Sequence, residues 1–148
     1  MTRQLIVIIS TIGIFLSCNN SVDNNATIQT AAQDLNFIDT IVADGCSELY
    51  TLDNVSLKEK KYIFSHDKFE TANIKIGTEN IMLKTDTFYS VSENLWVKIF
   101  KGNGYTVEIR ITETKQTGDE VYYEKGTLEI NHNGQPKYKV DIHGESGC

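Results

Sequence analysis

Proline is almost absent from this 148-residue chain, which contains only Pro136. The chain also has one tryptophan, three histidines and three cysteines, and it lacks a Cys-x-x-Cys motif, which makes thiol redox catalysis a poor expectation. Lys and Arg form no cluster beyond Lys58 to Lys61, and the formal net charge is −6. We therefore expect no nucleic acid among the partners of this chain.

The longest apolar run lies at the amino terminus, from Leu5 to Leu16. A helix over these residues would extend roughly 18 Å, well short of the hydrocarbon core of a bilayer, which is about 30 Å thick. The run is therefore too short for a membrane-spanning helix. With Arg3 before it, the run has the form of a secretion signal.

The residues Phe15-Leu16-Ser17-Cys18 resemble the lipobox of bacterial lipoproteins, although Phe15 stands where leucine is usual. The resemblance implies that residues 1–17 are a signal peptide and that Cys18 is acylated and becomes the first residue of the mature chain. Two or more acyl chains are needed for a stable anchor in the lipid bilayer. Asn19, in place of Asp, implies sorting to the outer membrane of the bacterial envelope. The alternative is an ordinary cleaved signal that leaves Cys18 as a thiol.

The residues that follow Cys18 contain many Asn, Ser and Asp side chains and few large apolar ones. This composition predicts a flexible tether that holds a folded domain away from the bilayer. We therefore divide the chain into a signal peptide over residues 1–17, an acylated cysteine and tether over residues 18–35, and one β domain over residues 36–148. About 115 residues suit a single domain with one core.

Two cysteines remain once acylation removes Cys18 from any pairing. Cys46 lies near the start of the domain and Cys148 is the last residue. An even number of cysteines in an exported protein favours a disulfide. We predict a bond between Cys46 and Cys148, which would close a loop of about 100 residues and contribute up to roughly 4.7 kcal/mol. Reduced thiols and a redox-active pair are the alternatives.

Alternation of apolar and polar residues predicts β-strands through most of the domain. The clearest cases are Tyr105 to Thr112 and Lys137 to Ile142. Shorter strands are expected at Phe37–Val42, Glu48–Leu52, Tyr62–Phe64, Ala72–Ile76, Ile81–Lys84, Leu95–Phe100 and Val121–Ile130. No segment after the tether has a helical period. The sequence thus predicts an all-β fold, an antiparallel meander of about eight strands in a small closed or partly closed barrel, with a two-sheet sandwich as the alternative.

Two local irregularities are also predicted. The apolar positions change phase between Tyr123 and Leu128, which predicts a β-bulge at Gly126. Pro136 cannot donate to a ladder, which favours a four-residue loop from Asn133 to Pro136 over a tight turn.

The sequence shows no catalytic or metal-binding constellation. His132 and His143 lie on one hairpin about 20 Å apart, too far to share a metal ion. His66-Asp67 is interpreted as a solvated surface pair in a loop, and Ser146 as part of a mobile tail. We therefore expect no catalytic residue, no metal ligand and no cofactor, and a protein that is not an enzyme, although a site assembled in space stays open.

Two aromatic residues are the candidates for ligand binding. Trp96 shares a strand face with Lys98, opposite the apolar Val97, and Tyr122 shares a face with Glu124. If Val97 belongs to the core, Trp96 is solvent-exposed, and exposed Trp and Tyr are typical of recognition surfaces. The alternative is that both faces of these strands are buried.

Three functions are compatible with these features. The first is a non-catalytic envelope lipoprotein whose β domain binds a protein or a small ligand. A specific form resembles the periplasmic lysozyme inhibitors, which include small β-barrel lipoproteins with a disulfide, but their Ser-Gly-x-x-Tyr motif is not found at Ser146-Gly147-Cys148. The second is an outer-membrane assembly or structural factor. The third is an enzyme with a clustered polar site.

Overall fold

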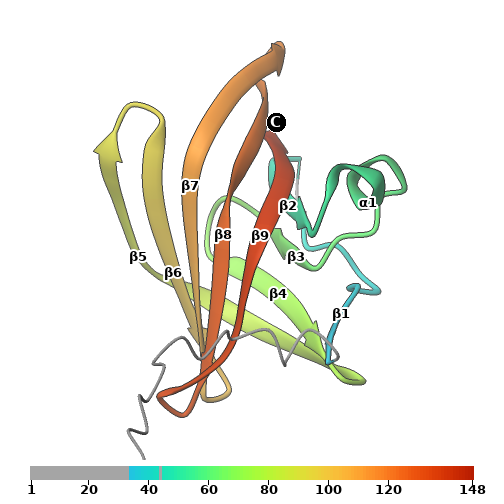
Figure 1. Cartoon of the computed structure of the whole chain (residues 1–148), viewed down its shortest axis with the longest axis vertical. Coiled ribbons are helices and arrows are strands. Elements are labelled where there is room, and N and C mark those ends of the chain that lie inside the picture. Colours follow the sequence, from blue (N-terminus) through green and yellow to red (C-terminus); the bar gives the residue numbers. More distant parts are fainter. Residues whose placement is uncertain (1–33, 44) are drawn as a thin grey trace, which may run out of the picture.

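The computed structural model describes residues 34–43 and 45–148, and it confirms the all-β antiparallel barrel. The ring of eight strands runs β4, β3, β2, β9, β8, β7, β6 and β5, and β5 pairs with β4 to close it (Figure 1). A ninth strand, β1, pairs with β4 outside the ring. The elements are β1 (Leu35–Asn36), β2 (Ser47–Thr51), α1 (Asn54–Lys58), β3 (Phe64–His66), β4 (Thr71–Ile76), β5 (Glu79–Ser92), β6 (Leu95–Gly102), β7 (Tyr105–Gly118), β8 (Val121–His132) and β9 (Gln135–Gly147).

Apolar side chains fill the barrel at one end, which we call the closed end. Strand alternation places every second residue inside, and cross-strand partners share a face. Most of the inward side chains here are buried, and the buried ones come from seven of the eight strands of the ring: Phe64, Ala72, Ile74, Ile81, Leu83, Phe100, Val107, Ile109, Ile111, Leu128, Ile130, Tyr138 and Ile142. In the described part of the chain, no helix is both long and apolar enough to cross a membrane.

The other end of the barrel has an incomplete wall. Strand β3 stops at His66 and β4 starts at Thr71, which pairs with Lys84, whereas β5 continues to Ser92. Among the described residues, β5 beyond Thr85 pairs only with β6. We call this part of the barrel the open end; in Figure 1 it lies at the top, where β5 to β8 rise above β4.

The predicted bulge exists, but its extra residue lies in β7 and not at Gly126. The register shifts between Ile111, opposite Gly126, and Glu113, opposite Lys125. The inward phase of β8 does not change, because Val121 and Tyr123 face outward throughout. Gly126 is needed for another reason: a Cβ there would lie 2.0 Å from the Arg110 carbonyl oxygen of β7.

The prediction of a four-residue loop at Asn133 is wrong. Asn133 and Gly134 both have positive φ angles, 50° and 77°, as a tight two-residue hairpin turn requires. β9 already begins at Gln135, and the register shifts where Pro136 pairs with Asn131. The missing N–H of Pro136 is thus accommodated by an irregularity in the ladder.

Two further segments differ from the prediction. The stretch expected as a strand from Phe37 to Val42 is irregular, and side chains of β3 and β4 hold it: the Val42 N–H donates to Ser65 Oγ, and Asn73 Nδ2 donates to the Thr40 carbonyl. The helix α1 was not predicted. Its cap is Asp53, whose carboxylate accepts two N–H groups of the first turn.

The predicted disulfide between Cys46 and Cys148 is present in the structure. It joins residues that are 102 positions apart, next to the pairing of Ser47 on β2 with Gly147 on β9. The bond therefore fastens the first and last strands of the ring together at the open end.

Candidate functional site

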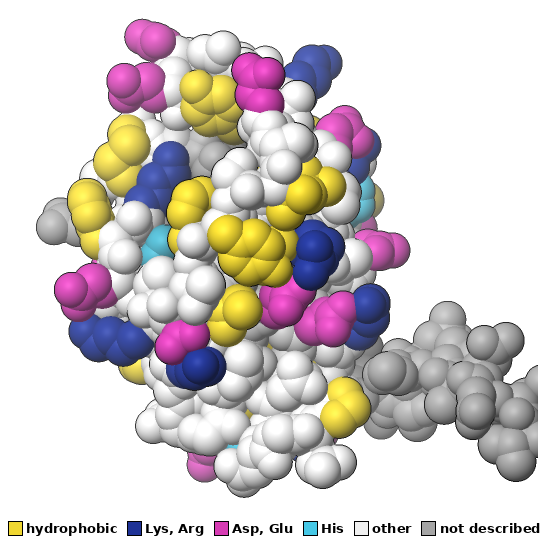
Figure 2. All heavy atoms as spheres, turned by 90° about the vertical axis from the view of Figure 1, so that its left-hand side faces the viewer, with side chains coloured by type: hydrophobic (Ala, Val, Ile, Leu, Met, Phe, Trp, Pro, Cys, Tyr) yellow, Lys and Arg dark blue, Asp and Glu magenta, His cyan; other side chains and the backbone are white. Residues whose placement is uncertain are grey.

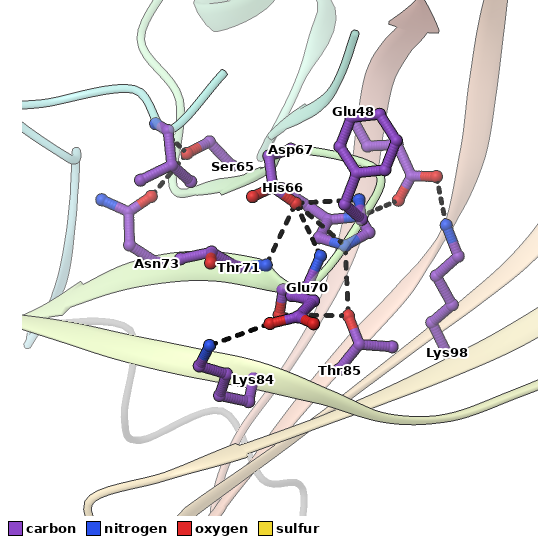
Figure 3. A network of polar contacts seen from close by, with 12 residues as sticks. Glu48, Ser65, His66, Asp67, Glu70, Thr71, Asn73, Lys84, Thr85 and Lys98 are labelled. Atoms are coloured by element: carbon purple, nitrogen blue, oxygen red, sulfur yellow. Dashed lines mark hydrogen bonds and ion pairs between the residues drawn. The ribbon is translucent and has the colours of Figure 1, made fainter. Parts of the chain in front are cut away.

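Three charged or titratable side chains meet inside the open end: Glu48 from β2, His66 from β3 and Lys98 from β6. His66 Nδ1 lies 3.0 Å from Glu48 Oε2, and Lys98 Nζ donates a short hydrogen bond to Glu48 Oε1. The exposed fractions of the side chains are 6% for Glu48, 1% for His66 and 14% for Lys98. Figure 3 shows the Glu48 carboxylate between its two partners.

The strand register dictates this arrangement. Glu48 and His66 are directly opposite each other on β2 and β3, so both point into the barrel. Lys98 is opposite the buried Ile109 and therefore also points inward. Although the three residues are distant in sequence, barrel closure brings them together.

The loop between β3 and β4 and the side chain of Thr85 on β5 lie on the side of His66 away from Glu48. The Asp67 carboxylate accepts hydrogen bonds from the N–H groups of Phe69, Glu70 and Thr71, at 2.8–3.0 Å, which fixes the turn. The Thr85 hydroxyl of β5 lies 3.2 Å from His66 Nε2, so both ring nitrogens of His66 have a partner (Figure 3). The His66 ring is thus locked in one orientation.

A second buried carboxylate lies two strands away. The Tyr50 hydroxyl donates to Glu124 Oε2 over 2.6 Å, and both residues are buried. Ser146 is also buried, and it is opposite Tyr122 on one side and Glu48 on the other. The interpretation of Ser146 as part of a mobile tail is therefore wrong, because it lies within β9.

The two carboxylates differ in their pKa shifts. Burial acts to raise the pKa of Glu48, but the hydrogen bond to His66 and the charge of Lys98 outweigh it, so the net shift is downward from 4.5. Burial raises the pKa of Glu124, and the negative charge of Glu48 adds to the shift, so the net change is upward. Burial, with both carboxylates nearby, also raises the pKa of Tyr50 well above 10.

Aromatic side chains lie above the charged groups. Lys98 Nζ is 5.0 Å from the centre of the Trp96 ring and 5.5 Å from that of Phe88, within the range of cation–π attraction. The two rings are 6.2 Å apart and inclined at 56°. Phe88 points inward, opposite Lys98, yet its exposed fraction is 56%, so solvent reaches the interior at this end.

The structure revises the prediction for Trp96 and Tyr122. Both are half-buried and lie on the inward face, since Trp96 is opposite the buried Ile111 and Tyr122 is opposite Ser146. Val97 lies on the outer face of β6, opposite Tyr89 and Arg110, but it is fully buried, so both faces of β6 are covered at this point, as in the alternative. The two candidates therefore share one concave face at the open end and do not form an outer surface.

One polar atom at this end lacks a partner. Thr114 is opposite Glu124 on β7 and therefore faces inward. Its hydroxyl oxygen is the only buried side-chain polar atom, among the described residues, that has no hydrogen-bond partner. Most such atoms in proteins are satisfied, so the Thr114 hydroxyl is an exception at this end.

The remaining histidines lie outside this site. The His132 ring stacks on Tyr105, with centroids 4.3 Å apart, and His143 Nδ1 is 2.7 Å from the Tyr123 hydroxyl on the outer face. In residues 34–43 and 45–148, no group of His, Cys, Asp and Glu is placed to hold a metal ion. Cys18 lies outside the described residues.

Sequence reasoning missed Glu48, His66, Lys98 and Glu124. The interpretation of His66 as a solvated surface residue is wrong, because it is buried in β3. One signal was available: Lys98 occupies an inward position between Trp96 and Phe100, where a lysine needs a partner. The identity of that partner depends on barrel closure and is not encoded locally.

Comparisons with known proteins give no match to a family model, to a curated protein or to a solved structure. The geometry of the site therefore has to carry the functional argument. It offers a rigid set of hydrogen-bonding groups below exposed aromatic rings, which is an arrangement suited to holding a ligand.

Proposed function

We propose that this chain is a lipid-anchored lipoprotein of the bacterial envelope whose barrel binds a ligand in its open end without catalysis. The observation that carries the proposal is that three aromatic side chains, Phe88, Trp96 and Tyr122, face into the barrel and are still partly exposed. Below them lie fixed charged groups. Apolar rings around a few convergent polar groups are the usual composition of ligand sites.

The energetics of the charged groups support this proposal. A buried ion pair contributes little to stability compared with apolar residues of similar size. An apolar layer at Glu48 and Lys98 would continue the packing of the closed end and would stabilise the fold at least as well. Because the charges are not needed for stability, their presence inside the open end favours a role in recognition.

The arrangement favours binding over reaction. The Glu48 carboxylate has two cationic or donor partners, and Glu124 accepts from Tyr50, so these groups are held by each other. Groups that are locked in this way pre-organise a site. For this reason we assign no catalytic role to them.

Location supports the same function. The lipobox-like residues that end at Cys18 favour a location in the envelope, where a tether would give the open end access to ligands. We propose the outer membrane as the site of anchoring. Acylation can be tested by mass spectrometry of the mature protein: a diacylated amino-terminal Cys18 is expected, and a chain that starts elsewhere or carries a free Cys18 thiol would contradict the anchor.

A photo-cross-linking experiment in the native cells tests ligand binding. A benzophenone amino acid is placed at Phe88, which faces inward, and in a matched variant at Tyr89, which faces outward and has a similar exposed fraction, 43%. We expect an adduct with position 88 and none with position 89. Equal adducts at both positions, or none at position 88, would contradict a ligand site inside the barrel.

The same adduct decides what kind of molecule is bound. A small mass identifies a ligand, whereas a protein adduct would identify a partner such as a lysozyme or a component of an outer-membrane assembly. A turbidity assay with lysozymes of different classes is the companion measurement for the resemblance to lysozyme inhibitors. No inhibition of any class would remove that alternative.

A further inference from the structure

The chemistry of the open end restricts the ligand that it can hold, provided that the proposed binding function is correct. The floor of the site is closed, because Phe64 and Phe100 are fully buried with their ring centroids 5.1 Å apart. His66 packs on Phe100 at 4.9 Å. A long acyl chain therefore has no room to enter the barrel, and the ligand must lie across the open end.

The charges at this end disfavour an ionic ligand. Lys98 and Glu48 form an ion pair, so their charges cancel. The Lys98 ammonium already lies over the rings of Phe88 and Trp96, so it would repel a cation that approached these rings. An anion would meet the carboxylates of Glu48 and Glu124, and Lys98 is already paired. A neutral ligand fits best.

The remaining groups match a ligand with both apolar faces and hydroxyl groups. The rings of Phe88, Trp96 and Tyr122 offer flat apolar surfaces that can pack against C–H groups. The hydroxyl of Thr114, which is buried and lacks a partner, marks the polar wall beside which the hydroxyls of a ligand would lie. Figure 2, which faces the β5 side, shows many hydrophobic side chains on this side of the molecule. Met82, Phe88, Tyr89 and Val91 of β5 are exposed; Phe88 faces the barrel interior, whereas Met82 and Tyr89 face outward.

We infer that the open end binds a neutral saccharide, whose C–H faces pack on Phe88, Trp96 and Tyr122 and whose hydroxyls bond to the polar groups around Thr114. The inference deepens the proposed function and depends on it. It names the ligand class from the pairing of Lys98 with Glu48, the closed floor and the partly exposed rings together.

The chain contains its own probe, since Trp96 is its only tryptophan. We would titrate the purified full-length protein, in a detergent without a sugar headgroup, with chitohexaose, cellohexaose and maltohexaose and follow Trp96 fluorescence. The matched control ligand is fully deacetylated chitohexaose, which keeps the same backbone and is positively charged when all probes are titrated below the pKa of its amines; an oligogalacturonate serves as the anionic control. A saturable change in emission with at least one neutral probe, and at least tenfold weaker binding of the charged probes, is expected.

Variants locate the binding. Phe88→Ala and Tyr122→Ala should each raise the Kd of the neutral probe about tenfold, which corresponds to about 1.4 kcal/mol. Tyr89→Ala, on the opposite face of β5, should leave the Kd within twofold. Thermal unfolding of each variant confirms that it is folded. If Tyr89→Ala weakens binding as much as the other two, the saccharide is not bound at the inward face.

The result that overturns the inference is distinct from the failure of binding itself. If no neutral probe changes Trp96 emission, or if charged probes bind as well as neutral ones, the ligand is not a neutral saccharide. A cross-linked adduct at position 88 would then still support the binding function. The lack of any adduct at position 88 would instead remove both the function and the inference.

Discussion

The two ends of the barrel are built from the same strands but have different interiors. At the closed end the inward side chains are mainly apolar, and most are buried, including Phe64, Ile109 and Leu128. At the open end the inward side chains are charged, hydroxylated or aromatic. The difference indicates that the closed end provides the stability of the fold and that the open end is free to provide recognition.

Strand β6 shows the change along three successive inward residues. Phe100 is fully buried in the core, Lys98 is paired with Glu48, and Trp96 is half-buried at the open end. Along one strand the surroundings thus pass from apolar packing through a buried ion pair to solvent. The opening in the wall, where β3 and β4 end, explains the difference.

The largest expected effect is a difference in stability between a substitution at the closed end and one at the open end. Phe64→Ala at the closed end should lower the free energy of unfolding by about 3–5 kcal/mol, because it leaves a cavity in the core. Phe88→Ala at the open end should lower it by less than about 1 kcal/mol, since its ring is largely exposed. Urea unfolding measures both values, and similar losses in the two variants would contradict the comparison.

The disulfide should give the next largest effect. Replacement of Cys46 and Cys148 by serine together should cost about 2–5 kcal/mol, because the loop of 102 residues is no longer closed in the unfolded state. Since the bond fastens β2 to β9 beside Glu48 and Ser146, binding at the open end should weaken as well. Unfolding and binding are measured with and without reductant. A loss of stability with unchanged binding would show that the clamp does not shape the site.

Glu48→Gln should lower the free energy of unfolding at neutral pH. Removal of one partner of a buried ion pair costs about 3–5 kcal/mol, and we expect a value at the lower end of this range. The pKa of Glu48 is lowered in the folded state, so its contribution is present above its ordinary pKa of 4.5 and is lost as the pH falls through the folded value. The difference from wild type should therefore shrink in acid. A difference that does not depend on pH would contradict the ionic role of Glu48.

Glu124→Gln should have the smallest effect and the opposite pH dependence. The pKa of Glu124 is raised in the folded state, so its contribution to stability is present below 4.5 and is lost as the pH rises through the folded value. The neutral Gln avoids this loss and can still accept from Tyr50. Relative to wild type, the variant should gain stability as the pH rises above 4.5. A variant that loses stability over this range would show that Glu124 is stabilised as a carboxylate.

The sequence predicted the fold because the evidence for it is local. The alternation in Tyr105 to Thr112 and the sequence of turns are sufficient to predict an antiparallel meander. The tight turn at Asn133 and the bulge in β7 were misjudged, since Pro136 and Gly126 were each interpreted without their partner strand. In both cases the neighbouring strand decided the outcome.

The candidate site could be predicted only in part. Trp96 and Tyr122 were identified by their residue types, but assigning their faces required knowing that Val97 points outward. Glu48, His66 and Lys98 come from three strands that only barrel closure unites, so no sequence window contains their relationship. From sequence, buried charges of this kind can be identified only as polar residues at strand positions that alternate in step with the core residues.

The central claim, that the open end holds a ligand, is tested most directly by native mass spectrometry of the protein released from its own cells under non-denaturing conditions. The wild-type protein and Tyr89→Ala should carry the same additional bound mass, and Trp96→Ala and Tyr122→Ala should lose it while remaining folded. A bound mass that persists in Trp96→Ala and Tyr122→Ala, or a wild-type protein that carries none, would contradict the account.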